Sequence, residues 1–83
     1  MPFSNLYITN VLDALTSSTA RVEASRNVHL LKNALILNEF YKNYDIDRQI
    51  DVLLQRGLNG FDQYPVIARS YFLEVKKTVE SNL

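Results

Sequence analysis

Apolar residues recur at helical spacing along most of the chain, beginning near its N-terminus. In an α-helix, residues three or four positions apart lie on one face. The spacing over positions 5–15 predicts a first helix whose apolar face consists of Ile8, Val11, Leu12 and Leu15. The polar run at positions 16–19 ends this helix, because Ser and Thr side chains compete for backbone hydrogen bonds and favour turns.

The next segment, positions 19–43, predicts one long central helix. No Gly or Pro interrupts this segment, and apolar residues occupy most of its sides between Val28 and Tyr41. At 1.5 Å per residue, about 25 residues give a helix of ~38 Å. A helix that is apolar on most sides is a buried helix, so we expect other elements to surround it.

Two further helices are expected beyond this point. Positions 46–56 carry an apolar face and are followed by Gly57, which we expect to end the helix as a left-handed residue. Positions 62–81 predict a fourth helix, in which Pro65 is tolerated because it falls in the first turn. No stretch alternates as a strand does. The pattern predicts the all-α class: a small helical bundle of three to four helices with one long central helix, in a single domain over positions 1–83.

The size and composition of the chain limit what can stabilise this fold. The chain has 83 residues, no Cys and a single His, His29. A domain of this size buries only about 60% of the surface that its unfolded chain exposes, so its own core is marginal. The composition excludes disulfides and Cys-rich or His-rich metal sites. Association with a protein is the remaining source of extra stability, so we expect a protein partner.

Charge and hydropathy narrow the choice of partners further. Nine basic and nine acidic residues are mixed along the chain, whereas nucleic-acid binding depends on Lys and Arg contacts to phosphate. No run of about 18 apolar residues predicts a membrane span. The N-terminus, MPFSNLYITN, lacks the basic and apolar regions of a secretory signal. We expect a cytoplasmic protein whose partner is neither a nucleic acid, a membrane nor a small-molecule substrate.

The candidate metal-binding and catalytic sites lack the residues that their chemistry requires. The acidic segment from Asp45 begins like a calcium-binding loop, but Ile50 and Arg56 stand where that loop needs Gly and Glu. We interpret Asp45 and Asp47 as caps of the third helix. His29 has no nucleophile and carboxylate arranged with it in the manner of a triad. No catalytic residue, metal ligand or cofactor is expected, and we do not expect an enzyme.

The third and fourth helices leave one alternative function open. Two helices joined by a Gly-containing turn invite comparison with the DNA-binding helix-turn-helix, although that motif uses a turn of three to four residues and the expected gap here is longer. Only Gln63, Arg69 and Ser70 could read base edges near the start of the fourth helix. A small DNA-binding regulator built on these two helices is therefore the second hypothesis.

Aromatic residues are concentrated in the second half of the chain, where seven of the nine lie between positions 40 and 72. Many of them are expected to fill the core where the later helices meet. Tyrosine also suits contact surfaces that are partly wet, because its ring is apolar and its hydroxyl is polar. The aromatic residues fit either a core alone or a core together with an interface, and the sequence leaves both open.

The function that these patterns favour is a small helical protein–protein interaction module, a homo-oligomeric adaptor or regulator acting through apolar and tyrosine-rich helix faces. A second copy is the expected partner, in a homodimer or a higher oligomer. Two-fold dimers are the commonest oligomers, and zero net charge offers little repulsion between copies. The candidate interaction residues are Val28, Leu31, Leu35, Phe40, Tyr41, Tyr44, Phe61, Tyr64 and Tyr71.

Overall fold

Four α-helices and one short 3₁₀ helix make up the secondary structure of residues 4–83, the part of the chain that the computed structural model describes. The helices are α1 (Asn5–Thr16), α2 (Arg21–Leu37), η1 (Phe40–Lys42), α3 (Tyr44–Gly60) and α4 (Pro65–Glu80). No strand occurs among these residues. The expected all-α class is confirmed. The expected single domain over positions 1–83 also includes positions 1–3, which lie outside the described residues.

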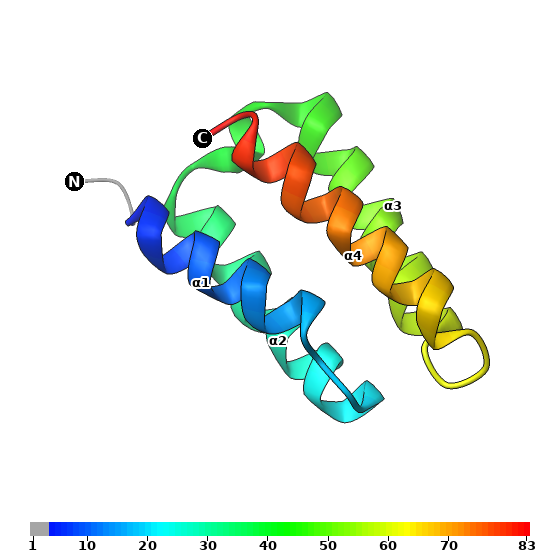
Figure 1. Ribbon diagram of the computed structural model, residues 1–83. Coiled ribbons are helices and arrows are strands. Elements are labelled where there is room, and N and C mark those ends of the chain that lie inside the picture. Colours follow the sequence, from blue (N-terminus) through cyan, green and yellow to red (C-terminus); the bar gives the residue numbers. More distant parts are fainter. Residues whose placement is uncertain (1–3) are drawn as a thin grey trace.

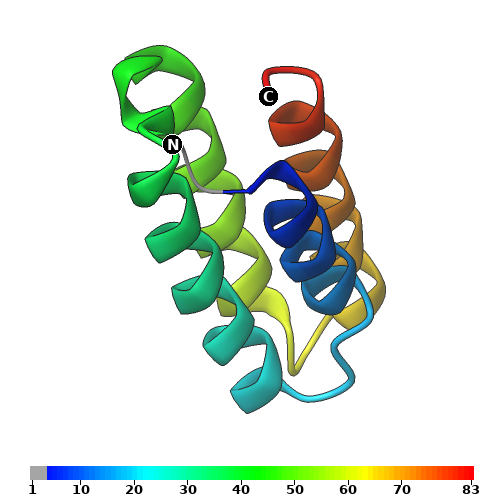
Figure 2. The ribbon, with the colours of Figure 1, turned by 90° about the vertical axis from the view of Figure 1, so that its left-hand side faces the viewer.

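The helices form two antiparallel hairpins that lie side by side. α1 and α2 form the first hairpin and α3 and α4 the second, and α1 packs against α4 across the junction between them (Figure 1). Figure 2 shows α2 and α3 on one side of the molecule and α1 and α4 on the other. Among these neighbouring pairs, α2 and α3 make the fewest contacts. The side of the bundle between α2 and α3 is therefore its least tightly closed side.

The core lies where the inward faces of all four helices meet. Burial of these side chains is the main favourable contribution to folding, because apolar surface removed from water contributes about 25 cal/mol per Å². The largest fully buried side chains are Ile8, Leu12, Leu15, Leu31, Ile50, Leu54, Phe72, Val75 and Val79. The four residues predicted for the inner face of the first helix are all buried.

The expected long helix over positions 19–43 is not observed. α2 ends at Leu37, Glu39 adopts a left-handed backbone conformation (φ 64°, ψ 24°), and the chain turns through η1 into α3. This turn buries Phe40 and allows α3 to return along the bundle, where Ile50 and Leu54 enter the core. Tertiary packing has overridden a local sequence pattern that favours continued helix, as it commonly does.

The predicted end of the third helix is also wrong. α3 begins at Tyr44 and continues to Gly60, and Gly57 lies within it without a positive φ. A Cβ placed on Gly57 would overlap the ring of Phe72 on α4. Glycine at this position therefore permits the close approach of α3 and α4, and it does not cap a helix.

The predicted caps of the third helix need correction as well. Asn43 occupies the N-cap position of α3, and its side chain makes no capping hydrogen bond. Asp45 and Asp47 lie in the first turn, where a negative charge is favourable beside the positive end of the helix dipole. Their contribution to α3 is thus electrostatic.

Each hairpin is fixed internally by contacts at its own connection. Between α1 and α2, the Asn27 Nδ2 donates to Ser18 Oγ at 3.0 Å, and Ser18 Oγ donates to the carbonyl of Ala14 at 3.0 Å. Between α3 and α4, Phe61 is buried and its ring packs against Phe72 with centroids 6.3 Å apart. The two hairpins are consequently well-defined units within the fold.

Candidate interaction surface

A groove of about 430 Å³ lies between α2 and α3, along the least tightly closed side of the bundle. It lies beside the short connection between the end of α2 at Leu37 and the start of α3 at Tyr44. Its lining residues come from α2, η1 and α3: Lys32, Leu35, Ile36, Tyr41, Tyr44, Asp47, Arg48, Ile50, Asp51 and Leu54.

The floor and the rim of this groove differ in exposure. Leu35, Ile50 and Leu54 form an apolar floor and are at least 96% buried. Ile36 and Tyr44 stand on the rim and are 58% and 67% exposed. A partner that enters the groove would therefore meet apolar surface both inside it and at its edge.

Charged side chains of both signs border the groove. The Lys32 Nζ lies 3.0 Å from the Asp51 Oδ1, which joins α2 to α3, and Asp47 and Arg48 lie close by on α3. Both members of the ion pair are substantially exposed, and ion pairs of this kind contribute about 0–1 kcal/mol. The border thus carries two basic and two acidic groups with no excess of either sign.

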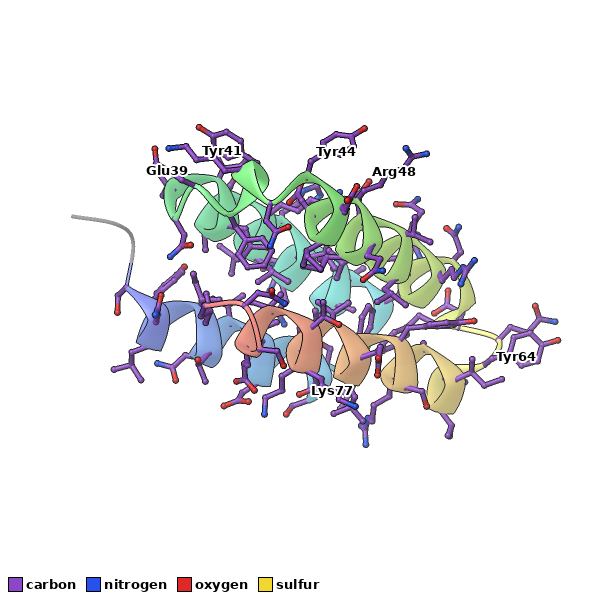
Figure 3. The ribbon with its side chains drawn as sticks, turned by 90° about the horizontal axis from the view of Figure 1, so that it is seen from above. Glu39, Tyr41, Tyr44, Arg48, Tyr64 and Lys77 are labelled. Atoms are coloured by element: carbon purple, nitrogen blue, oxygen red, sulfur yellow. The ribbon has the colours of Figure 1, made fainter. Side chains whose placement is uncertain are left out.

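Several exposed apolar side chains lie close together in sequence at the connection between α2 and α3, and others are spread over the helices. We call Ile36, Leu37, Tyr41 and Tyr44 the connection cluster; all four are at least half exposed. Figure 3 shows Tyr41, Tyr44 and Arg48 projecting from the same side of the molecule, with Lys77 on the opposite side. A second exposed group lies at the start of α4 and consists of Tyr64, Val66 and Ile67, and in Figure 3 Tyr64 stands at the far end of the bundle.

The structure places the nine predicted interaction residues in two environments. Five of them are buried within the chain's own core: Val28, Leu31, Leu35, Phe40 and Phe61. Tyr41, Tyr44 and Tyr64 are exposed, and Tyr71 is half-buried. Only Leu35, Tyr41 and Tyr44 line the groove. The tyrosines at the connection therefore remain candidates for contact with a partner. The five buried residues contribute to the stability of the single chain's own core.

Sequence reasoning missed several residues of this surface. Ile36 and Leu37 were expected to be covered as parts of one long helix, and they are exposed because that helix ends at Leu37. The pair of Lys32 and Asp51 depends on the return of α3 beside α2, and no spacing rule within one helix reveals it. The one signal in the sequence was the apolar C-terminal end of the expected long helix. That signal identifies an exposed surface only if the helix is known to end at Leu37.

The described residues lack three features that can mark a functional site. No group of three or more His, Cys, Asp or Glu side chains within residues 4–83 is placed to hold a metal ion. No buried side-chain nitrogen or oxygen in that part of the chain lacks a hydrogen-bond partner. None of the described helices is both long and apolar enough to cross a membrane.

A search of protein-family models, of curated proteins and of solved structures finds no significant match to this chain.

Proposed function

We propose that this chain is a small protein–protein interaction module that self-associates through the face formed by α2, η1 and α3. One observation carries the proposal: the connection cluster leaves two tyrosines and two aliphatic side chains exposed beside an apolar groove, on the least tightly closed side of the bundle. Interfaces are enriched in tyrosine, and large apolar groups gathered on a surface mark contact sites.

The charges on this face favour a second copy as the partner. In a two-fold dimer the same surface meets itself, so it must be complementary to itself. Two basic and two acidic groups border the groove. The basic groups of one copy can therefore face the acidic groups of the other, and repulsion between like charges is avoided. The zero net charge of the chain adds no general repulsion.

The packing of α3 and α4 disfavours the DNA-binding alternative. The connection between α3 and α4 covers only positions 61–64, which is shorter than the sequence predicts and agrees with the turn of three to four residues in the DNA-binding motif. However, α3 and α4 lie side by side and antiparallel (Figure 1), whereas the helices of the DNA-binding motif cross at about 90–120°. Exposed acidic residues, Glu74 and Glu80, also lie along α4 beside its basic ones, which disfavours contact with phosphate.

A matched pair of tyrosine substitutions tests the proposal. Tyr44→Ser removes a ring from the connection cluster, and Tyr64→Ser removes a similarly exposed ring at the far end of the bundle. Sedimentation equilibrium should show that Tyr44→Ser weakens self-association by about 1–2 kcal/mol, or roughly tenfold, and that Tyr64→Ser leaves it unchanged. Equal effects of both variants, or a chain that is monomeric at every concentration, would contradict the proposal.

A further inference from the structure

We infer that two copies associate by exchanging hairpins. In this arrangement, which rests on the proposed self-association, the connection at positions 38–43 opens and α2 and α3 join into one continuous helix. The α3–α4 hairpin of each copy then packs on the α1–α2 hairpin of the other. Exchange of an identical element is a low-cost route to a dimer, because each transferred contact already exists within the single chain.

The first support is the backbone of Glu39. It is the single described non-glycine residue with a positive φ, at 64°, and a side chain with a Cβ is strained in this region. Glutamate is a good helix former, and positions 38–43 contain neither Gly nor Pro. Straightening the connection therefore removes the backbone strain at Glu39 and produces a helix that the local sequence favours.

The second support is the way in which the two hairpins are joined. Each hairpin is fixed at its own connection, by Ser18 and Asn27 in the first and by Phe61 and Phe72 in the second. The contacts between α2 and α3 are few, and α1 packs on α4 across the same junction. Opening the connection between α2 and α3 leaves both hairpins intact, and the α1–α4 packing can re-form between copies.

The contacts between the hairpins can form equally well between two copies. They include the packing of α1 on α4, the Lys76–Asp13 ion pair at 3.3 Å and the Lys32–Asp51 ion pair at 3.0 Å. The Arg21 Nε also donates to the carbonyl of Leu58 at 3.2 Å. None of these contacts involves the residues at positions 38–43. An exchanged dimer therefore retains the packing and the ion pairs that join the hairpins in the monomer.

The third support is the location of the connection cluster. A continuous helix from Arg21 to Gly60 has about 40 residues and a length of ~60 Å, and its midpoint falls beside Phe40. The cluster, at positions 36–44, surrounds this midpoint. Two such helices related by a two-fold axis approach each other there, so the exposed tyrosines and aliphatic side chains, together with Phe40, would pack against their counterparts. The exchange thus accounts for exposed apolar groups at this position.

Isotope mixing with chemical cross-linking tests this inference on the unmodified sequence. Equal amounts of ordinary and ¹⁵N-labelled protein are unfolded together, refolded, and treated with a carbodiimide, which joins a lysine amine to a carboxylate in contact with it. Mass spectrometry then reports whether each cross-linked peptide pair is isotopically uniform or mixed. The Lys76–Glu80 pair within α4 is an internal control that should stay uniform in every state.

An exchanged dimer should give mixed Asp13–Lys76 and Lys32–Asp51 cross-links in about half of the pairs. A dimer whose cross-links at both sites are all uniform would overturn the exchange and leave the proposed self-association standing. A chain that is monomeric throughout would overturn both the exchange and the proposed function. The outcomes of the experiment therefore separate the two proposals.

A pair of substitutions at Glu39 provides the second measurement. Glu39→Gly removes the strain of the closed turn and weakens the open helix, so it should raise the dissociation constant of the dimer at least tenfold. Glu39→Ala also removes the ion pair with Lys42 but keeps a Cβ and a strong helix former, so it should leave the dimer as tight or tighter. Indistinguishable dissociation constants for the two variants would contradict the exchange.

Discussion

At the scale of single residues, glycine has a role here that differs from the one its sequence position suggests. Gly57 looks like the end of a helix because it follows an apolar face and a basic residue. In the structure it lies against the ring of Phe72, where no side chain fits. The feature that requires glycine is a contact with a helix later in the chain, and no local pattern reveals such a contact.

Alanine substitutions at the two glycines should have opposite results. Gly57→Ala introduces a Cβ that overlaps Phe72, so it should lower the free energy of unfolding by about 1–3 kcal/mol. Gly60→Ala meets no atom within 4 Å and should be neutral or stabilise α3 by up to about 1 kcal/mol. Urea denaturation of both variants measures this, and equal losses would show that the contact with Phe72 is unimportant.

At the scale of helices, the sequence predicts a bundle of three to four helices and most of the residues in them, but it does not predict η1. Apolar spacing places α1 within one residue of its observed end, because its face is continuous and a polar run follows it. The same rule fails between α2 and α3, since no Gly or Pro marks the break at positions 38–43. The turn depends on the burial of Phe40 and on the return of α3 to the core, which are properties of the whole fold.

The unexpected break between α2 and α3 also determines which of the candidate interaction residues the sequence could identify correctly. Leu31 and Leu35 belong to a helix that looked apolar on most sides, and their burial is provided by this chain. Tyr41 and Tyr44 were chosen as aromatic residues and do lie at the exposed connection. The groove itself could not be predicted, because it forms between helices whose boundaries depend on the break.

Packing, and not the ion pair, should hold α2 against the bundle. Leu35→Ala removes a buried side chain from the floor of the groove and should cost about 2–5 kcal/mol. Lys32→Ala breaks the exposed pair with Asp51 and should cost less than about 1 kcal/mol. Thermal unfolding in low and high salt provides the comparison. A larger loss for Lys32→Ala would mean that the ion pair dominates.

At the scale of the whole molecule, a core built by 83 residues leaves the chain marginally stable on its own. Within residues 4–83, α2 and α3 make few contacts with each other, and exposed apolar groups lie at their connection. A second copy would cover these groups and add stability that depends on protein concentration. Association and folding are therefore expected to be linked in this chain.

Metal ions should have no part in this stability. Ile50 and Arg56 occupy the positions at which a calcium loop needs Gly and Glu. Thermal melting should be unaffected by EDTA and by added calcium or zinc. A ligand at 100 times its dissociation constant would add about 2.7 kcal/mol, which a melting curve detects readily, so a clear rise with calcium would restore the segment after Asp45 as a binding loop.

The oligomeric state in solution tests the central claim most directly. Size exclusion coupled to light scattering, run over a dilution series, should give a mass near twice the 9.6 kDa of one chain at high concentration and a fall towards one chain on dilution. The melting temperature should rise with concentration over the same range, since dimerisation stabilises the folded state. A mass of one chain at every concentration, with a constant melting temperature, would contradict self-association.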